Sequence, residues 1–173
     1  SPRGQLTLAM WQPPALDPFV PPTRPGPDAA ADTSTSGPTS ASSGPRQSVL
    51  SEAARVLTTL VEGDARCLAF TRSRRAAETV AAHTTQMLSA HASRHADKVR
   101  AYRAGYLAQD RRELEQQISS GQVRALAATS ALELGVDISG LDAVVLAGWP
   151  GRTESFWQRV GRAGRAGSDG LAV

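Results

Sequence analysis

The chain has 173 residues, with 19 Lys and Arg against 16 Asp and Glu and a formal net charge of +3. This length is enough for one well-filled hydrophobic core and short for two full domains. A single cysteine, Cys67, excludes an internal disulfide framework and fits a reducing compartment. The sequence has neither a signal peptide nor the run of about 18 apolar residues that spans a bilayer, so we expect no membrane partner and a cytoplasmic location.

The basic residues are unevenly distributed. Lys98 is the sole lysine among 19 basic residues, and the segment from Arg66 to Arg165 holds 15 basic against 9 acidic residues. A GC-rich genome accounts for arginine in place of lysine, but it does not account for the local excess. That excess favours a polyanion as the partner.

The first 47 residues differ in composition from the rest. Apolar residues alternate from Gln5 to Trp11, which predicts a strand, and Pro13 and Pro14 follow it. Residues 17–47 consist largely of Pro, Gly, Ser, Thr and Ala and carry too little apolar surface to form a core. We expect residues 1–16 to hold the first strand, 17–47 to be a flexible insertion and 48–173 to form the domain proper.

Four helices are predicted after residue 48. Apolar residues lie on one helical face over 48–62, and Ser73 is expected to cap the next helix. Asp110 is the expected cap of a third helix with Glu113 at the capping-box position, and Thr153 is the expected cap of the last.

Strands of the buried type alternate with these helices. They are expected at 66–71, 99–102, 122–128 and 143–147, and 170–173 resembles the opening of another. Strands that alternate with helices predict an α/β fold with a central, mostly parallel sheet covered on both faces.

The octet from Gln158 to Arg165 reads Gln-Arg-Val-Gly-Arg-Ala-Gly-Arg and is the most informative segment. Rigid guanidinium groups suit the neutralisation of charge on a transferring phosphoryl group. Gly161 and Gly164 remove side chains beside them, so that bulky groups can approach. The alternative is a solvated basic helix end, although glycine costs about 1 kcal/mol relative to alanine inside a helix.

Ligands of parallel sheets collect in the loops that follow strands. The loop with Arg72 and Ser73 offers a hydroxyl, backbone N–H groups and a basic side chain, which suit phosphate, although an ordinary serine cap followed by surface arginines is the alternative. In segment 129–138, Gly135 permits a close approach and Asp137 can accept hydrogen bonds from ribose hydroxyls. The alternative there is a turn that ends in an aspartate cap. A third loop, 101–107, carries Tyr102 and Tyr106, which suit either the core or a stacking surface.

These segments resemble the motifs of superfamily-two helicases. Loop 70–75 resembles motif IV, 129–138 motif V and the octet motif VI, in which the last two arginines point at the γ-phosphate. Loop 101–107 resembles the segment that grips the strand between motifs IV and V. The resemblance implies a RecA-like domain in which the catalytic residues are Gln158, Arg162 and Arg165, the ATP-binding residues Gly135 and Asp137, and the nucleic-acid-binding residues Arg72, Ser73, Arg103, Gly105 and Thr129.

Gln158 stands where DEAD-box proteins carry histidine, which points to the DExH branch. Segments 101–106, 131–148 and 157–158 are similar to bacterial mitomycin-repair helicases and fungal RecQ-four-like relatives. That resemblance implies a 3′→5′ DNA helicase with a zinc-binding C-terminal domain, which one cysteine cannot supply here. His91 and His95 lie four residues apart without a third ligand, so we expect no metal site in this chain.

The Walker A loop and the DExH box are both absent from the sequence. ATP would therefore bind between this domain and a first RecA-like domain that holds the Mg²⁺ ligands, and this chain by itself would be inactive. A double-stranded-DNA translocase with the same core, or a degenerate nucleic-acid-binding module without hydrolysis, are the alternatives.

Overall fold

The computed structural model describes residues 4–16, 46–102, 107–129, 138, 141–164 and 168–173. Ten elements are described, and their order alternates strand and helix except where β4 is followed by β5. The elements are β1 (Leu6–Leu8), α1 (Val49–Glu62), β2 (Cys67–Phe70), α2 (Arg74–Ala90), β3 (Val99–Ala101), α3 (Ala108–Ser119), β4 (Ala125–Ala128), β5 (Ala143–Leu146), α4 (Thr153–Val160) and β6 (Gly170–Ala172).

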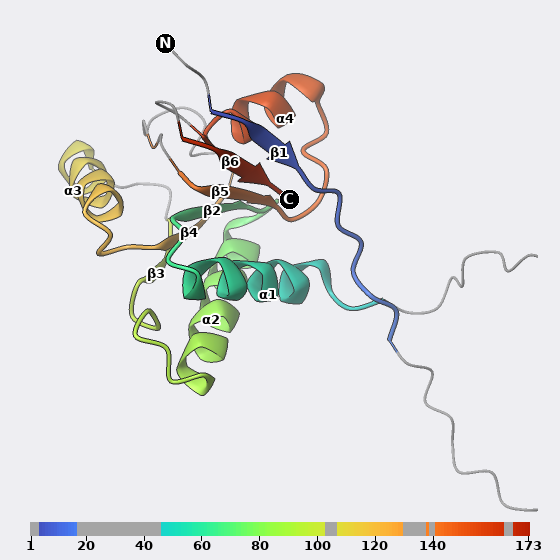
Figure 1. The fold of residues 1–173 in the computed structure, drawn as a ribbon, viewed down its shortest axis with the longest axis horizontal. Coiled ribbons are helices and arrows are strands. Elements are labelled where there is room, and N and C mark those ends of the chain that lie inside the picture. Colours follow the sequence, from blue (N-terminus) through green and yellow to red (C-terminus); the bar gives the residue numbers. More distant parts are fainter. Residues whose placement is uncertain (1–3, 17–45, 103–106, 130–137, 139–140, 165–167) are drawn as a thin grey trace, which may run out of the picture.

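The strands form one sheet in the order β1-β6-β5-β2-β4-β3, and every described pairing is parallel. Helices α1 and α2 lie on one face of the sheet, and α3 and α4 lie on the other (Figure 1). The predicted α/β fold with a central parallel sheet is confirmed. Strand β1 joins the outer edge through β6, so the N-terminal strand belongs to the same sheet as the rest of the domain.

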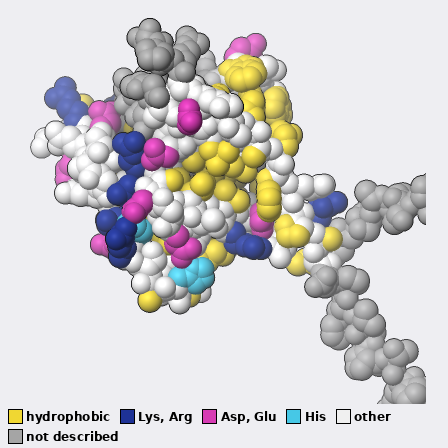
Figure 2. Space-filling model, viewed as in Figure 1, with side chains coloured by type: hydrophobic (Ala, Val, Ile, Leu, Met, Phe, Trp, Pro, Cys, Tyr) yellow, Lys and Arg dark blue, Asp and Glu magenta, His cyan; other side chains and the backbone are white. Residues whose placement is uncertain are grey.

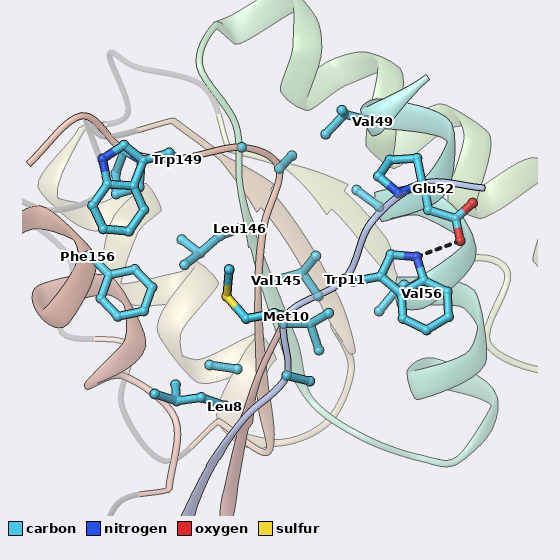
Figure 3. A pocket seen from close by; sticks show the side chains of 18 residues that line it. Leu8, Met10, Trp11, Val49, Glu52, Val56, Val145, Leu146, Trp149 and Phe156 are labelled. Carbon is cyan, nitrogen blue, oxygen red and sulfur yellow. Dashed lines mark hydrogen bonds between the residues drawn. The ribbon is translucent and has the colours of Figure 1, made fainter. Parts of the chain in front are cut away.

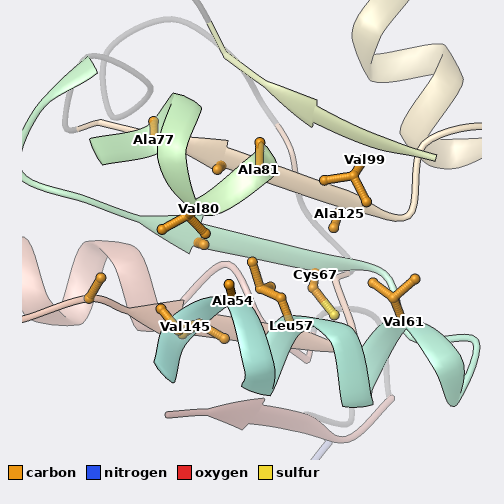
Figure 4. Packing of buried hydrophobic residues seen from close by; sticks show 14 of the residues in the cluster. Ala54, Leu57, Val61, Cys67, Ala77, Val80, Ala81, Val99, Ala125 and Val145 are labelled. Atoms are coloured by element: carbon orange, nitrogen blue, oxygen red, sulfur yellow. The ribbon is translucent and has the colours of Figure 1, made fainter. Parts of the chain in front are cut away.

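Alternate side chains of the central strands enter two separate cores. Cys67 and Ala69 of β2 pack toward α1 and α2, while Leu68 and Phe70 pack toward the opposite face. Figure 4 shows the first core, in which Leu57 of α1 lies against Cys67. Four consecutive buried residues in β2 therefore reflect a strand covered on both faces.

Cys67 is a core residue. It is 2% exposed, and burial, followed by the nearby charge of Asp142, raises the pKa of its thiol to about 12. The thiol therefore stays neutral and unreactive at physiological pH. Tyr102 is likewise buried, at 7% exposure, so of the two interpretations of this residue the core is the correct one.

The predicted caps are right for α2 and wrong for two other helices. Ser73 Oγ accepts a hydrogen bond from the Ala76 N–H at 3.1 Å, as expected for an N-cap. Asp110 lies inside the first turn of α3, where its carboxylate accepts from the Leu107 N–H at 3.1 Å. That bond satisfies the N–H of the residue that precedes the helix, so the helix begins at Ala108, earlier than predicted.

Glu113 is therefore not a capping-box residue, and its carboxylate instead accepts from Gln117 Nε2 at 3.3 Å. Thr153 is the first residue of α4 rather than its cap, because Arg152 before it has the extended backbone of an N-cap. In the part of the chain that the structure describes, no helix is long and apolar enough to cross a bilayer.

Candidate nucleotide and nucleic-acid site

Three loops meet at the carboxyl edge of the sheet. Phe70 at the end of β2 is in register with Ala128 of β4 and with Leu146 of β5. The residues that follow these three strands therefore lie side by side, although they are far apart in the sequence. This edge brings together Arg72, Ser73 and Thr129, which the sequence predicted as nucleic-acid-binding residues.

Thr71 attaches the first of these loops to the sheet. Its N–H donates to the Ala128 carbonyl at 2.8 Å, and its Oγ1 lies 3.2 Å from the same oxygen and 3.1 Å from the Ser73 carbonyl. The side chain is buried, at 3% exposure, while Arg72 and Ser73 beside it are exposed. Thr71 positions the loop that carries Arg72 and Ser73, and the sequence motifs did not indicate this role. A hydroxyl residue directly after a buried strand was the feature that could have pointed to it.

Arg72 lies against the end of β5. Gly148 has a φ of +101°, and a Cβ added there would lie 3.5 Å from Arg72 Nε. That distance is an ordinary van der Waals contact, so the positive φ, and not the approach of Arg72, is what favours glycine at this position. Ser73 Oγ accepts from the Ala76 N–H, which leaves its own hydrogen free to be donated to a phosphate oxygen. An arginine and a capped helix start offer suitable donors for a phosphate.

The arginines of the octet have different environments. Arg159 is 8% exposed, and its guanidinium carbon lies 5.1 Å from the centroid of the Phe70 ring, a cation–π contact within the core. Arg162 is half-buried, and its Nη1 donates to the Ile138 carbonyl at 3.4 Å. Gln158 is exposed on α4. The structure therefore joins the octet to Ile138, the last residue of segment 129–138.

The octet starts near the carboxyl edge, where Arg159 packs on Phe70, but its described end does not lie there. Ala163 forms a parallel bridge with Leu141, which precedes β5, and the Gly164 N–H donates to the Leu141 carbonyl at 3.0 Å. The chain after α4 has therefore returned to the amino end of β5, on the face covered by α3 and α4. The described end of the octet and the exposed Arg72 and Ser73 therefore lie toward opposite ends of the sheet.

Gly164 serves the packing of the chain itself. It has a φ of +71°, and a Cβ added there would lie 2.9 Å from the nitrogen of Gly170, the first residue of β6. The glycine therefore makes room for β6 rather than for a ligand, which corrects the interpretation drawn from the sequence at this position.

The remaining predicted site residues, Arg103, Gly105, Gly135, Asp137 and Arg165, lie outside the described residues. Thr129 is half-buried directly after β4. His91 and His95 each contact a carboxylate, Nδ1 of His91 at 2.7 Å from Glu62 and Nε2 of His95 at 2.9 Å from Asp64. Within the described part of the chain, no group of three or more His, Cys, Asp and Glu side chains could hold a metal ion.

An apolar trough of about 300 Å³ opens at the carboxyl edge beside Arg72 and Gly148 (Figure 3). Trp149 and Phe156 form one wall and Trp11 and Val49 the other, as Figure 3 shows. Among the described residues that line it, the one charged side chain is Glu52, which is 4% exposed and accepts a hydrogen bond from Trp11 Nε1 at 3.0 Å. In Figure 2, apolar side chains gather on the side toward which the strands point, and most charged side chains lie on the opposite side.

Comparison with known proteins identifies the family of this chain. The family described as "Helicase conserved C-terminal domain" matches residues 50–167. ATP-dependent helicase hrq1 of Schizosaccharomyces pombe is 33% identical over all of this chain, and the ATP-dependent helicase YprA of Bacillus subtilis is 34% identical over 74% of it. The DUF1998 helicase MrfA, solved bound to DNA and also to DNA with AMPPNP, superposes with a TM-score of 0.66 over 73% of this chain at 34% identity.

This chain spans only a small part of these relatives. It covers 14% of the hrq1 protein, 17% of YprA and 18% of the MrfA chain. The similarity therefore concerns one domain of a much longer kind of protein.

Proposed function

Because the chain belongs to the helicase conserved C-terminal domain family, we propose that it is the second RecA-like domain of an ATP-dependent superfamily-two DNA helicase that moves 3′→5′. The observation that carries this proposal is the hydrogen bond from Arg162 to the Ile138 carbonyl. It holds a guanidinium beside the segment that resembles motif V, where it can neutralise charge on a phosphoryl group.

ATP would bind between the face that carries the octet and a first RecA-like domain. Arg162 and Arg165 stabilise the charge that develops on the γ-phosphate, and Gln158 lies on the same helix end to contact it. Gly135 and Asp137 contact the nucleotide, with the carboxylate of Asp137 accepting from the ribose hydroxyls. Mg²⁺ is assigned to the first domain, because the sequence of this chain contains neither a Walker A loop nor a DExH box.

The DNA strand would cross the carboxyl edge of the sheet. Its phosphates are contacted by Arg72, Ser73 and Thr129. Further contacts to the same backbone come from Arg103 and Gly105. Contacts of this kind position the strand without reading its sequence. Closure of the two domains on ATP and reopening after hydrolysis then shift the strand by a step. The same proposal includes a cytoplasmic location, at the nucleoid.

The direct test is a strand-displacement assay with the full-length protein on duplexes that carry either a 3′ or a 5′ single-stranded tail. A 3′→5′ helicase unwinds the 3′-tailed duplex with ATP and leaves the 5′-tailed duplex intact. Movement along duplex DNA without unwinding would instead identify a double-stranded-DNA translocase. DNA binding without any ATP hydrolysis by the full-length protein would identify a degenerate binding module.

A further inference from the structure

Trp149 presents an aromatic face at the end of β5. Its side chain is 54% exposed although it is large and apolar. The Phe156 ring of α4 stacks on it, with centroids 5.3 Å apart and an interplanar angle of 26°. The stack fixes the orientation of the indole, so a flat partner would meet a surface that is already ordered.

The position of this face relates it to the phosphate-binding loop. Gly148, directly before Trp149, is the residue against which the Arg72 guanidinium packs. The exposed indole of Trp149 therefore lies next to Arg72, which belongs to the proposed phosphate contacts. A basic side chain next to an exposed, rigid aromatic ring is the combination by which proteins hold single-stranded nucleic acid.

The chemistry of the trough selects an uncharged occupant. Its walls are apolar, and the one charged side chain among the described residues that line it, Glu52, is buried and lies 3.7 Å from Arg55 Nη1. No Lys or Arg occurs among the described lining residues, and apolar walls cannot replace the water around a phosphate, so the backbone of a strand is excluded from the trough and stays at Arg72. A nucleobase is flat and uncharged. It projects from the sugar-phosphate backbone, so a strand whose phosphates lie at Arg72 can place a base in the neighbouring trough.

We propose that Trp149 is a stacking platform for one nucleobase of the single strand whose phosphates Arg72 and Ser73 bind, with the base entering the apolar trough. This inference rests on the proposed function, since it needs a strand at the carboxyl edge. It adds a contact to the base itself, which tolerates any sequence because every base has a π-face.

The test compares two strands of equal length, oligo(dT) and an abasic strand with the same phosphate backbone, in low salt. Trp149→Ala should weaken binding of oligo(dT) by roughly 5- to 150-fold, the range for loss of one stacked base. Its affinity for the abasic strand should equal that of the wild type. Trp157→Ala is the matched control, because Trp157 is also 54% exposed but meets Phe156 edge-on, at 78°, and does not line the trough.

Fluorescence supplies a second readout that does not depend on a truncated side chain. Oligo(dT) should quench tryptophan emission to the same extent in the wild type and in Trp157→Phe. The quenching should be clearly smaller in Trp149→Phe, in which Trp11 on the opposite wall is the one tryptophan of the trough that remains. Trp149→Phe keeps an aromatic face and should retain most of the affinity. The abasic strand should quench none of these proteins.

Equal affinity of Trp149→Ala and wild type for oligo(dT), with unchanged quenching, would overturn the stacking assignment and leave the proposed function standing. Absence of salt-dependent binding to either strand would overturn the proposed function together with this inference.

Discussion

The guanidinium of Arg159 lies 5.1 Å from the centre of the Phe70 ring, inside the core, whereas Arg162 three residues later bonds to the Ile138 carbonyl. One short basic segment thus contains a structural arginine and an arginine that faces the segment resembling motif V. We therefore expect substitutions at different arginines of the octet to affect different properties, either ATP hydrolysis or stability.

In the full-length protein, Arg165→Ala should lower kcat for ATP on the order of 10³-fold, as loss of a charge-neutralising arginine does in phosphoryl transfer. Folding and DNA binding should remain near wild type. Arg165→Lys should restore little activity, because an ammonium group cannot reproduce the planar guanidinium fork. Steady-state ATPase kinetics with saturating DNA measure the effect.

Arg159→Ala is the control for that experiment. It should lower thermal stability, since it removes a cation–π contact worth about 1–2 kcal/mol in a buried setting, yet kcat per folded molecule should fall far less than in Arg165→Ala. Equal and mild losses of kcat in both variants would show that the octet does not act on the γ-phosphate.

Thr71→Val should loosen the phosphate-binding loop. The substitution keeps the shape of the side chain but removes the hydroxyl that lies within hydrogen-bond distance of the Ala128 and Ser73 carbonyls. Loss of such a bond costs about 1 kcal/mol, and affinity for single-stranded DNA should fall with it. Thr71→Ser keeps the hydroxyl and should bind like the wild type. Identical affinity of the two variants would mean that Thr71 does not position Arg72 and Ser73.

Gly164→Ala should destabilise the domain more than Gly151→Ala. Both glycines have positive φ, at +71° and +89°, so both substitutions carry the strain of a left-handed backbone, about 1–2 kcal/mol. Only at Gly164 does the added Cβ collide, at 2.9 Å from the Gly170 nitrogen, whereas at Gly151 it meets nothing within 4 Å. Urea unfolding of the two variants measures the difference, and equal midpoints would contradict the packing role of Gly164.

Asp142 should make stability depend on pH. Partial burial raises the pKa of its carboxyl. Two hydrogen bonds from Arg66, together with the charges of Arg66 and Arg124, lower this pKa by a larger amount, so it lies below its ordinary value. The folded state therefore favours the ionised form. The contribution of the ionised Asp142 to the free energy of unfolding is present in full above the ordinary aspartate pKa of about 3.9. It is lost as the pH falls through the lowered pKa of the folded state.

Asp142→Asn should accordingly lower the free energy of unfolding at pH 7, and the gap to the wild type should narrow on acidification below about pH 4. Denaturant unfolding at several pH values measures this gap. A gap that stays constant down to the acid transition would show that the charge of Asp142 does not contribute.

The 173-residue chain alone should show no ATPase activity above background, with or without DNA, because it contains neither a Walker A loop nor a DExH box. It should bind ATP only weakly. Robust turnover by a pure sample would contradict the assignment of the catalytic Mg²⁺ site to another domain.

The sequence by itself determined the features that depend on neighbouring residues. Apolar runs such as 66–71 predicted buried strands because both faces of a parallel sheet are covered, and Ser73 predicted a cap because its hydroxyl needs only the N–H of Ala76. The octet also identified the helicase family, since its spacing of arginine and glycine is a local pattern.

Only the tertiary structure decided which partner each of these residues meets. Arg159 and Arg162 are both arginines of one short segment. Their environments differ because α4 packs with Arg159 over Phe70, whereas Arg162 donates to the Ile138 carbonyl. Trp149 meets Phe156, and Gly148 lies against Arg72, because strand register brings distant segments to one edge. Such contacts depend on how a helix or strand is placed against the sheet, and that placement is set by packing of the whole core rather than by the residues of one segment.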